Sequence, residues 1–211
     1  MDEIIKNTLA KDVILAKLID SIDPKSNMTA STTITTDIYF SLLDSIVSQQ
    51  LSVKAADTIF KRFLNLFPNQ YPAADLLIAA DTEQLRSAGL SYQKASYLKN
   101  TAMFFLENDL SFESMRLLTD EEIIKTLVQI KGVGKWTVEM MLMFVLFRPD
   151  VFPYDDLVVR NNIIKLYNID GKGAELKRKV MKIAENWRPY RTIACKYIWR
   201  WKDTPKIKIP S

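Results

Sequence analysis

The sequence contains no histidine and only one cysteine among its 211 residues. A structural zinc site needs about four Cys or His ligands and a cysteine-ligated iron–sulfur cluster about four cysteines, so we expect neither cofactor. Without histidine, Ser-His-Asp and Cys-His catalytic mechanisms are excluded as well. Cys195 cannot form an internal disulfide, which is typical of a protein in a reducing compartment.

The sequence also lacks a long uncharged apolar run. The nearest is the eight-residue stretch 140–147, flanked by Glu139 and Arg148, and a membrane span needs roughly 20 apolar residues. Residues 1–20 carry a charge every few positions and lack the apolar core of a secretory signal. We therefore expect no membrane association and a cytoplasmic location.

Positive charge is unevenly distributed along the chain. The net charge is +4, but residues 171–211 hold twelve Lys or Arg against three Asp or Glu. Segregated positive charge favours a polyanionic partner such as a nucleic acid. A solvated basic C-terminal tail explains the same excess equally well, so charge alone leaves both interpretations open.

Apolar residues recur at helical spacing through nearly the whole chain, as at Ile5, Leu9 and Val13. The predicted helices cover residues 3–22, 38–48, 52–66, 82–87, 93–108, 120–130, 135–147, 157–168, 174–186 and 190–200. No hairpin dipeptide separates two alternating β-branched runs. The sequence therefore predicts an all-α fold with roughly ten helices.

Short polar motifs mark where several of these helices begin or end. Ser52 is an expected N-cap, and residues 81–84 and 119–122 have the spacing of capping boxes. Gly89 is expected to end the helix over 82–87, and Pro189 to occupy the first turn of the last helix.

Residues 127–138 read LVQIKGVGKWTV and predict a helix, a tight glycine turn and a second helix. Glycine permits positive φ and lets another molecule approach the backbone closely. The amides of Gly132, Gly134 and Lys135 would then point outward at a helix N-terminus, which is an anion-binding arrangement. The expected anion is a nucleic-acid phosphate, bound without reading base sequence; a plain turn is the alternative.

Two adjacent carboxylates, Asp155 and Asp156, lie between a proline and the apolar start of a helix in VFPYDDLVVR, residues 151–160. One can be an N-cap while the other complements the helix dipole. The alternative is an acidic catalytic group at the edge of a cleft. The local sequence does not decide between these interpretations.

Four motifs together resemble the DNA-3-methyladenine glycosylase II family of helix-hairpin-helix DNA glycosylases. They are GVGKWT at 132–137, VFPxxDL at 151–157, SIVSQQLS at 45–52, and WRPYR at 187–191 with YIW at 197–199. The matches extend over residues 40–201 and follow the family's order. They imply two helical subdomains, 36–148 and 1–35 with 149–211, with DNA in the cleft between them, and no room for an additional N-terminal domain.

The resemblance implies that Asp156 is catalytic, with Asp155 as the second choice. A fixed anion stabilises the positive charge that develops on the deoxyribose as the N-glycosidic bond breaks. A purine alkylated at N3 or N7 is already cationic and leaves without a general acid. Trp136, Trp199 and Met140 match positions that line the base pocket, although a tryptophan on a helix is more often part of the core.

The hairpin of the family implies phosphate contacts by Gly132, Gly134, Lys135 and Thr137. It also implies a structural Na⁺ or K⁺ held by main-chain carbonyls, those of Val128, Ile130 and Val133 here. No other cofactor is expected. Relatives that resemble endonuclease III have a nucleophilic lysine directly before the motif threonine. That position is Trp136 here, so we expect no lyase activity.

The resemblance places Gln50 or Leu51 at the loop that fills the gap left by a flipped base, and a polar pair at a helix end is the alternative. We expect Lys94 either to contact a DNA phosphate or to be solvated. The implied activity is excision of alkylated purines such as 3-methyladenine from duplex DNA by a monomer, leaving an abasic site. The alternatives are a glycosylase for another lesion and a non-catalytic DNA-binding module.

Overall fold

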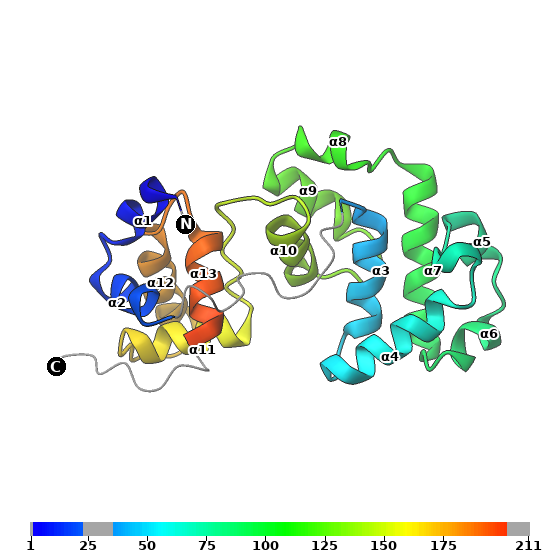
Figure 1. Ribbon diagram of the computed structural model, residues 1–211, viewed down its shortest axis with the longest axis horizontal. Helices are drawn as coiled ribbons and strands as arrows, with labels where there is room; N and C mark the ends of the chain where they lie inside the picture. The colour runs from blue at the N-terminus through cyan, green and yellow to red at the C-terminus, as the bar shows by residue number, and fades with distance from the viewer. Residues whose placement is uncertain (1, 23–35, 202–211) are drawn as a thin grey trace. The chain divides into compact units, whose positions relative to one another are not determined.

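The computed structural model describes residues 2–22 and 36–201, and within these ranges all regular elements are helical. The predicted all-α class is therefore confirmed for the described part of the chain. The chain divides into two compact units: unit 1 comprises Met1–Thr33 and Phe147–Ser211, and unit 2 comprises Ile34–Leu146 (Figure 1). Residues 202–211 of the basic C-terminal segment lie outside the described ranges.

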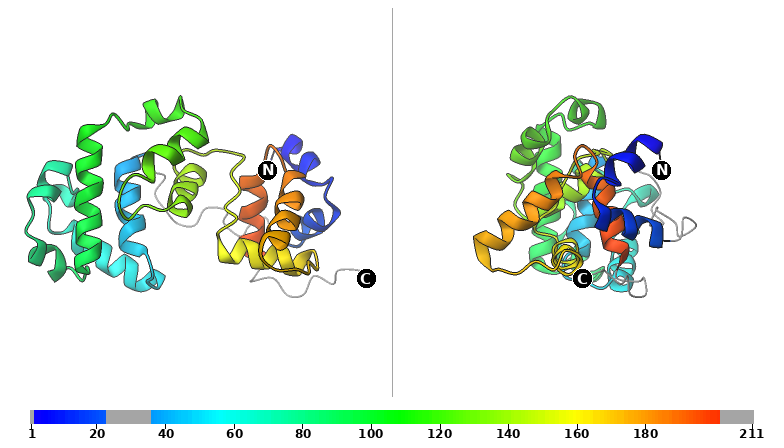
Figure 2. Two further views of the ribbon diagram at one scale, coloured as in Figure 1. Left: turned by 180° about the vertical axis from the view of Figure 1, so that it is seen from behind. Right: turned by 90° about the vertical axis from the view of Figure 1, so that its left-hand side faces the viewer.

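Unit 2 is built around one long helix, α7. Its helices are α3 (Ile38–Ser48), α4 (Val53–Leu64), α5 (Ala74–Ala79), α6 (Thr82–Ser87), α7 (Tyr92–Glu107), α8 (Phe112–Arg116), α9 (Asp120–Leu127) and α10 (Lys135–Phe144). Helix α7 packs between α3 on one side and α5 and α6 on the other (Figures 1 and 2). Leu42 and Ile46 of α3 and Leu98 of α7 are fully buried, and burial of each such side chain contributes about 1.5–3 kcal/mol.

Unit 1 combines the N-terminal helices with the C-terminal ones. Its helices are α1 (Glu3–Leu9), α2 (Val13–Ser21), α11 (Leu157–Leu166), α12 (Gly173–Glu185) and α13 (Arg191–Arg200). Helix α13 packs against both α11 and α2. This packing joins the two ends of the described chain and places α13 beside the helix that begins at Leu157.

The single helix predicted over 3–22 is wrong, because Asp12 divides it into α1 and α2. The Asp12 Oδ1 accepts hydrogen bonds from the amides of Ile14 and Leu15, both at 3.1 Å. Its Oδ2 accepts from the Tyr167 hydroxyl at 2.7 Å and from the Trp187 indole N–H at 2.9 Å. Burial, together with the Asp12 carboxylate, raises the pKa of Tyr167, so this hydroxyl stays protonated as a donor. A tertiary contact therefore interrupts an otherwise continuous helical periodicity.

The other predicted helices are confirmed to within three residues at each end. Two α-helices were not predicted, α5 and α8, which have six and five residues and are too short to show a clear period, and neither was the short 3-10 helix η1 (Pro68–Gln70). Pro189 lies before α13 rather than in its first turn, because that helix begins at Arg191.

The predicted helix boundaries marked by Ser52, Thr119 and Gly89 are confirmed. Ser52 caps α4 through the Ala55 amide, and Thr119 forms a complete capping box with Glu122 at the start of α9. Gly89 follows α6 with φ +104°, a left-handed conformation that favours glycine. Within the described ranges the longest helix has 16 residues, and no helix there is long and apolar enough to cross a membrane.

Candidate active site

Asp156 in unit 1 caps a helix, and two hydrogen bonds fix the position of its carboxylate. It is the N-cap of α11, and its Oδ1 accepts a hydrogen bond from the Val159 amide at 2.8 Å. The same oxygen accepts from the Trp199 indole N–H at 3.0 Å, and only 8% of the residue is exposed. Asp155 is exposed by contrast. The structure thus singles out Asp156 as the carboxylate held in place from two sides.

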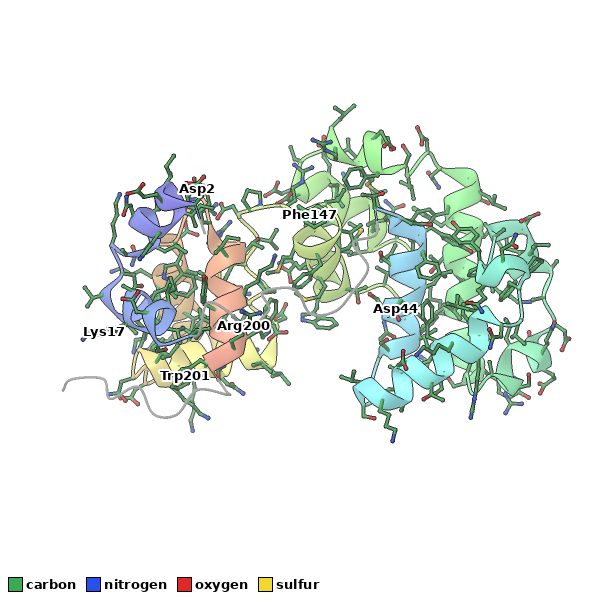
Figure 3. The ribbon with its side chains drawn as sticks, in the orientation of Figure 1. Asp2, Lys17, Asp44, Phe147, Arg200 and Trp201 are labelled. Carbon is green, nitrogen blue, oxygen red and sulfur yellow. The ribbon has the colours of Figure 1, made fainter. Side chains whose placement is uncertain are left out.

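Trp199 is on α13 and Asp156 caps α11, and a hydrogen bond joins these two helices beside the residues. The buried Asn162 side chain donates from Nδ2 to the carbonyl oxygen of Ile198 at 2.8 Å. Arg200 and Trp201, which follow Trp199, lie at the C-terminal end of α13 (Figure 3). Asn162 was not among the predicted site residues, and the only sequence signal for it is a polar residue on the otherwise apolar buried face of α11.

The WRPYR motif holds the segment that leads to Asp156. The Arg191 guanidinium donates to the Asp150 carboxylate and to the Asp150 carbonyl, both at 2.7 Å, and Arg188 pairs with the same carboxylate. Trp187 is fully buried. Because both arginines are engaged in ion pairs, this motif stabilises unit 1 and accounts for part of the C-terminal basic excess.

Thr192 adds a second clamp on the same segment. Its hydroxyl donates to the Arg148 carbonyl at 2.7 Å and accepts from the Val151 amide at 3.0 Å. Its own amide donates to the Pro149 carbonyl at 3.0 Å. The start of α13 therefore fixes residues 148–151, a segment that ends five positions before Asp156.

The glycine turn lies in unit 2 between α9 and α10, as predicted. Gly132 has φ +105°, and a Cβ built on it would lie 2.3 Å from the Cγ of Tyr97, so no other residue fits there. Gly134 is the N-cap of α10 with φ −92°, no side-chain cap and no atom within 4 Å of an added Cβ. The fold thus demands glycine at 132 but makes no such demand at 134.

Helix α10 begins directly at this turn and carries two of the three predicted pocket residues, Trp136 and Met140, whereas Trp199 lies on α13. Trp136, in its first turn, is 43% exposed, and Met140 one turn later is half-buried. Thr137 is buried, and its backbone amide lies in the first turn of α10, where helix amides have no intrahelical partner. Lys135 pairs with the buried Glu139 at 3.3 Å.

The predicted wedge residues lie in the loop between α3 and α4. Gln50 is exposed with φ +59°, and Leu51 is 37% exposed. Lys94, expected to be solvated or to contact a phosphate, instead donates to the carbonyls of Val47 and Gln49 at 2.6 and 2.7 Å. The expectation of a simply solvated lysine is therefore wrong, because the Lys94 ammonium caps the C-terminus of α3, and its contact with a phosphate stays a prediction.

The three carbonyls expected to hold a monovalent cation lie at the end of α9 and in the turn. Val128 is the C-cap of α9, and the Ile130 carbonyl accepts from the Val133 amide at 3.0 Å. A carbonyl oxygen with one hydrogen bond retains a second lone pair. The part of the chain that the structure describes contains no group of three or more Cys, Asp or Glu side chains suited to a metal.

Comparison with known proteins gives consistent matches. A family model described as "HhH-GPD superfamily base excision DNA repair protein" matches residues 43–189. The putative DNA-3-methyladenine glycosylase YfjP of Bacillus subtilis is 34% identical over 77% of this chain and 58% of its own length. DNA-3-methyladenine glycosylase 1 of Schizosaccharomyces pombe is 37% identical over 88% of this chain and 79% of its own length.

A solved structure matches as well. The 3-methyladenine DNA glycosylase Mag1 of Schizosaccharomyces pombe, in complex with abasic DNA, aligns with a TM-score of 0.79 at 33% identity. The alignment covers 95% of this chain and 97% of that chain. The fold is therefore shared over nearly the whole length of both chains.

Proposed function

The chain belongs to the HhH-GPD superfamily of base excision DNA repair proteins, and on this basis we propose that it excises alkylated purines such as 3-methyladenine from duplex DNA. The resemblance drawn from the four sequence motifs is thereby confirmed at the family level. Two relatives at 34% and 37% identity are named DNA-3-methyladenine glycosylases. The single observation that carries the proposal is the buried Asp156 carboxylate, which accepts from both Val159 and Trp199.

The Asp156 carboxylate supplies the charge that this reaction needs. As the N-glycosidic bond breaks, positive charge develops on the deoxyribose, and a preorganised anion in a dry site stabilises it without reorganising. Two N–H donors already fix Oδ1. The same carboxylate orients or deprotonates the attacking water. A cationic alkylated purine leaves without a general acid, which is consistent with a chain that has no histidine.

Trp136 is the residue that we propose stacks on the flipped base. Its exposed indole face attracts a cationic purine, with about 0.5–2 kcal/mol per cation–π contact. Met140 on the same helix adds a softer apolar wall. Trp199 remains a proposed wall of the base pocket, and its indole N–H, which donates to Asp156, also positions the carboxylate.

The glycine turn supplies the grip on the DNA backbone. We propose that the amides of Gly132, Gly134, Lys135 and Thr137 bind a phosphate, so affinity falls as salt rises. The carbonyls of the same turn offer hard oxygen ligands, which suit a structural Na⁺ or K⁺ beside that phosphate. We expect a cytoplasmic monomer, because one flipped nucleotide requires no second copy of the chain.

Incubation of the purified chain with methylated duplex DNA tests the activity. We expect 3-methyladenine to appear as a free base and the DNA to acquire abasic sites, because the positive charge of the alkylated purine weakens its glycosidic bond. Chromatography of the soluble fraction identifies the bases, with unmethylated duplex as the control. Release of a different damaged base alone would favour another lesion, and binding without release of any base would favour a non-catalytic DNA-binding module.

We further propose that the enzyme is of the DNA-3-methyladenine glycosylase II type and has no lyase activity. Trp136 occupies the position before Thr137 where bifunctional relatives have lysine, and Lys135 pairs with Glu139. Borohydride added during base release is therefore expected to trap no covalent complex with DNA. An endonuclease III-type lyase in a parallel reaction is the positive control. A sodium borohydride-stable adduct of this chain would contradict the proposal.

A further inference from the structure

Lys94, near the start of α7, is attached to the end of α3 through its ammonium group. The Nζ lies 2.6 Å from the carbonyl oxygen of Val47 and 2.7 Å from that of Gln49. A lysine that donates to the last carbonyls of a helix offsets both their unpaired acceptors and the negative end of the dipole. Burial lowers the pKa of this ammonium, in keeping with its withdrawal from solvent.

Gln49 carries the connection on to the glycine turn. Its Nε2 donates to the carbonyl of Gly132 at 3.0 Å, across 83 positions of sequence. The residue after Gln49 is Gln50, which has φ +59° and begins the exposed loop to α4. Lys94 and Gln49 together therefore bond the loop at 49–52 to the turn that contains Gly132.

The other side of the turn is packed against the same helix, α7. The ring of Tyr97, one turn after Lys94, fills the space where a Cβ of Gly132 would lie. One helix thus contacts the end of α3 through Lys94 and the glycine turn through Tyr97. The loop and the turn are consequently held in one fixed arrangement inside unit 2.

We propose that Lys94 and Gln49 are positioning residues for base flipping, which set where the loop at Gln50 and Leu51 stands relative to the phosphate held by the glycine turn. The inference rests on the proposed function. A flipped nucleotide leaves a gap in the duplex that a side chain must fill. Misplacement of such a group by about 1 Å costs up to 10²-fold in rate, so two elements that meet the same DNA need a fixed spacing.

The position of Lys94 predicts an effect that depends on the substrate. Lys94→Met keeps an unbranched side chain that is one atom shorter and removes both hydrogen bonds. Since hydrogen bonds from charged groups are the stronger kind, we expect single-turnover excision from a fully paired duplex to fall by about tenfold or more. The loss should shrink to about twofold or threefold when the lesion lies opposite an abasic analogue. A damaged base without a pairing partner costs little to flip out, so its excision depends less on the position of the loop.

Lys99→Met is the matched control. Lys99 is on the same helix, is also half-buried and donates to a main-chain carbonyl, that of Ala80, far in sequence from the loop. We expect Lys99→Met to give the same ratio of rates on the two substrates as the wild type. Lys94→Arg, which retains donors and charge, should recover part of the loss on the paired duplex.

Equal loss on both substrates, or no loss on either, would overturn the inference while leaving the proposed function intact. A wild-type chain that releases base from neither substrate would overturn both. Thermal melting of each variant gives the folded fraction used in the assay. If Lys94→Met does not fold, Gln49→Met removes only the hydrogen bond to the Gly132 carbonyl. Its excision rates are then compared on the same two substrates. A loss confined to the paired duplex supports the inference, and an equal loss or no loss overturns it.

Discussion

Gly132→Ala is expected to destabilise unit 2 and to abolish tight DNA binding. The new Cβ would lie 2.3 and 2.4 Å from two ring atoms of Tyr97, and the backbone has φ +105°. Overpacking and a strained left-handed residue each cost about 1–3 kcal/mol. We expect the free energy of unfolding to fall by about 2–6 kcal/mol, measured by denaturant titration. An unchanged unfolding midpoint would contradict the geometry of the turn.

Gly134→Ala tests DNA binding by the glycine turn separately from its stability. Gly134 has φ −92° and no atom within 4 Å of an added Cβ, so the change in stability should stay within about 1 kcal/mol. The methyl group would nevertheless occupy the space that a phosphate needs. DNA affinity at fixed salt should therefore fall by about tenfold. Equal affinity in a folded Gly134→Ala variant would show that no phosphate approaches this amide.

The hairpin and most helices could be predicted because their signals are local. The glycines of the turn lie two positions apart between apolar periodic segments, and the start of α9 has a complete capping box. Local signals fail where a tertiary contact prevails. Asp12 interrupts a continuous helical pattern because its second oxygen is bound by Tyr167 and Trp187, 155 and 175 residues away.

The candidate site could be predicted only in part. The local sequence offered a cap or a catalytic carboxylate for Asp156, and the structure shows that one oxygen caps α11 and also accepts from Trp199, 43 residues away. Periodicity holds no information on such partners. For the same reason the sequence did not reveal that Lys94 caps α3, a contact across 45 and 47 residues.

Asp156→Asn is expected to stop base release while leaving the fold and DNA binding in place. Asparagine is as good an N-cap as aspartate, so its carbonyl oxygen can still accept from Val159 and from the Trp199 indole. What the substitution removes is the negative charge. Loss of one preorganised electrostatic group costs about 10²–10³-fold in rate. Thermal melting should show that the variant folds like the wild type.

Asp155→Asn is the matched control, since it removes the same charge from the exposed neighbour of the catalytic candidate. We expect its excision rate to stay close to that of the wild type. A large loss of excision rate in Asp155→Asn, together with an active Asp156→Asn, would mean that Asp155 is the catalytic carboxylate.

The most direct measurement is the single-turnover rate of 3-methyladenine release from methylated duplex, with enzyme in excess of the dissociation constant determined for each variant. For Asp156→Asn the rate should fall by at least about 10²-fold, with DNA affinity within about threefold of the wild type, because phosphate contacts dominate affinity. Release by Asp156→Asn at the wild-type rate would show that the chemistry resides elsewhere in the chain.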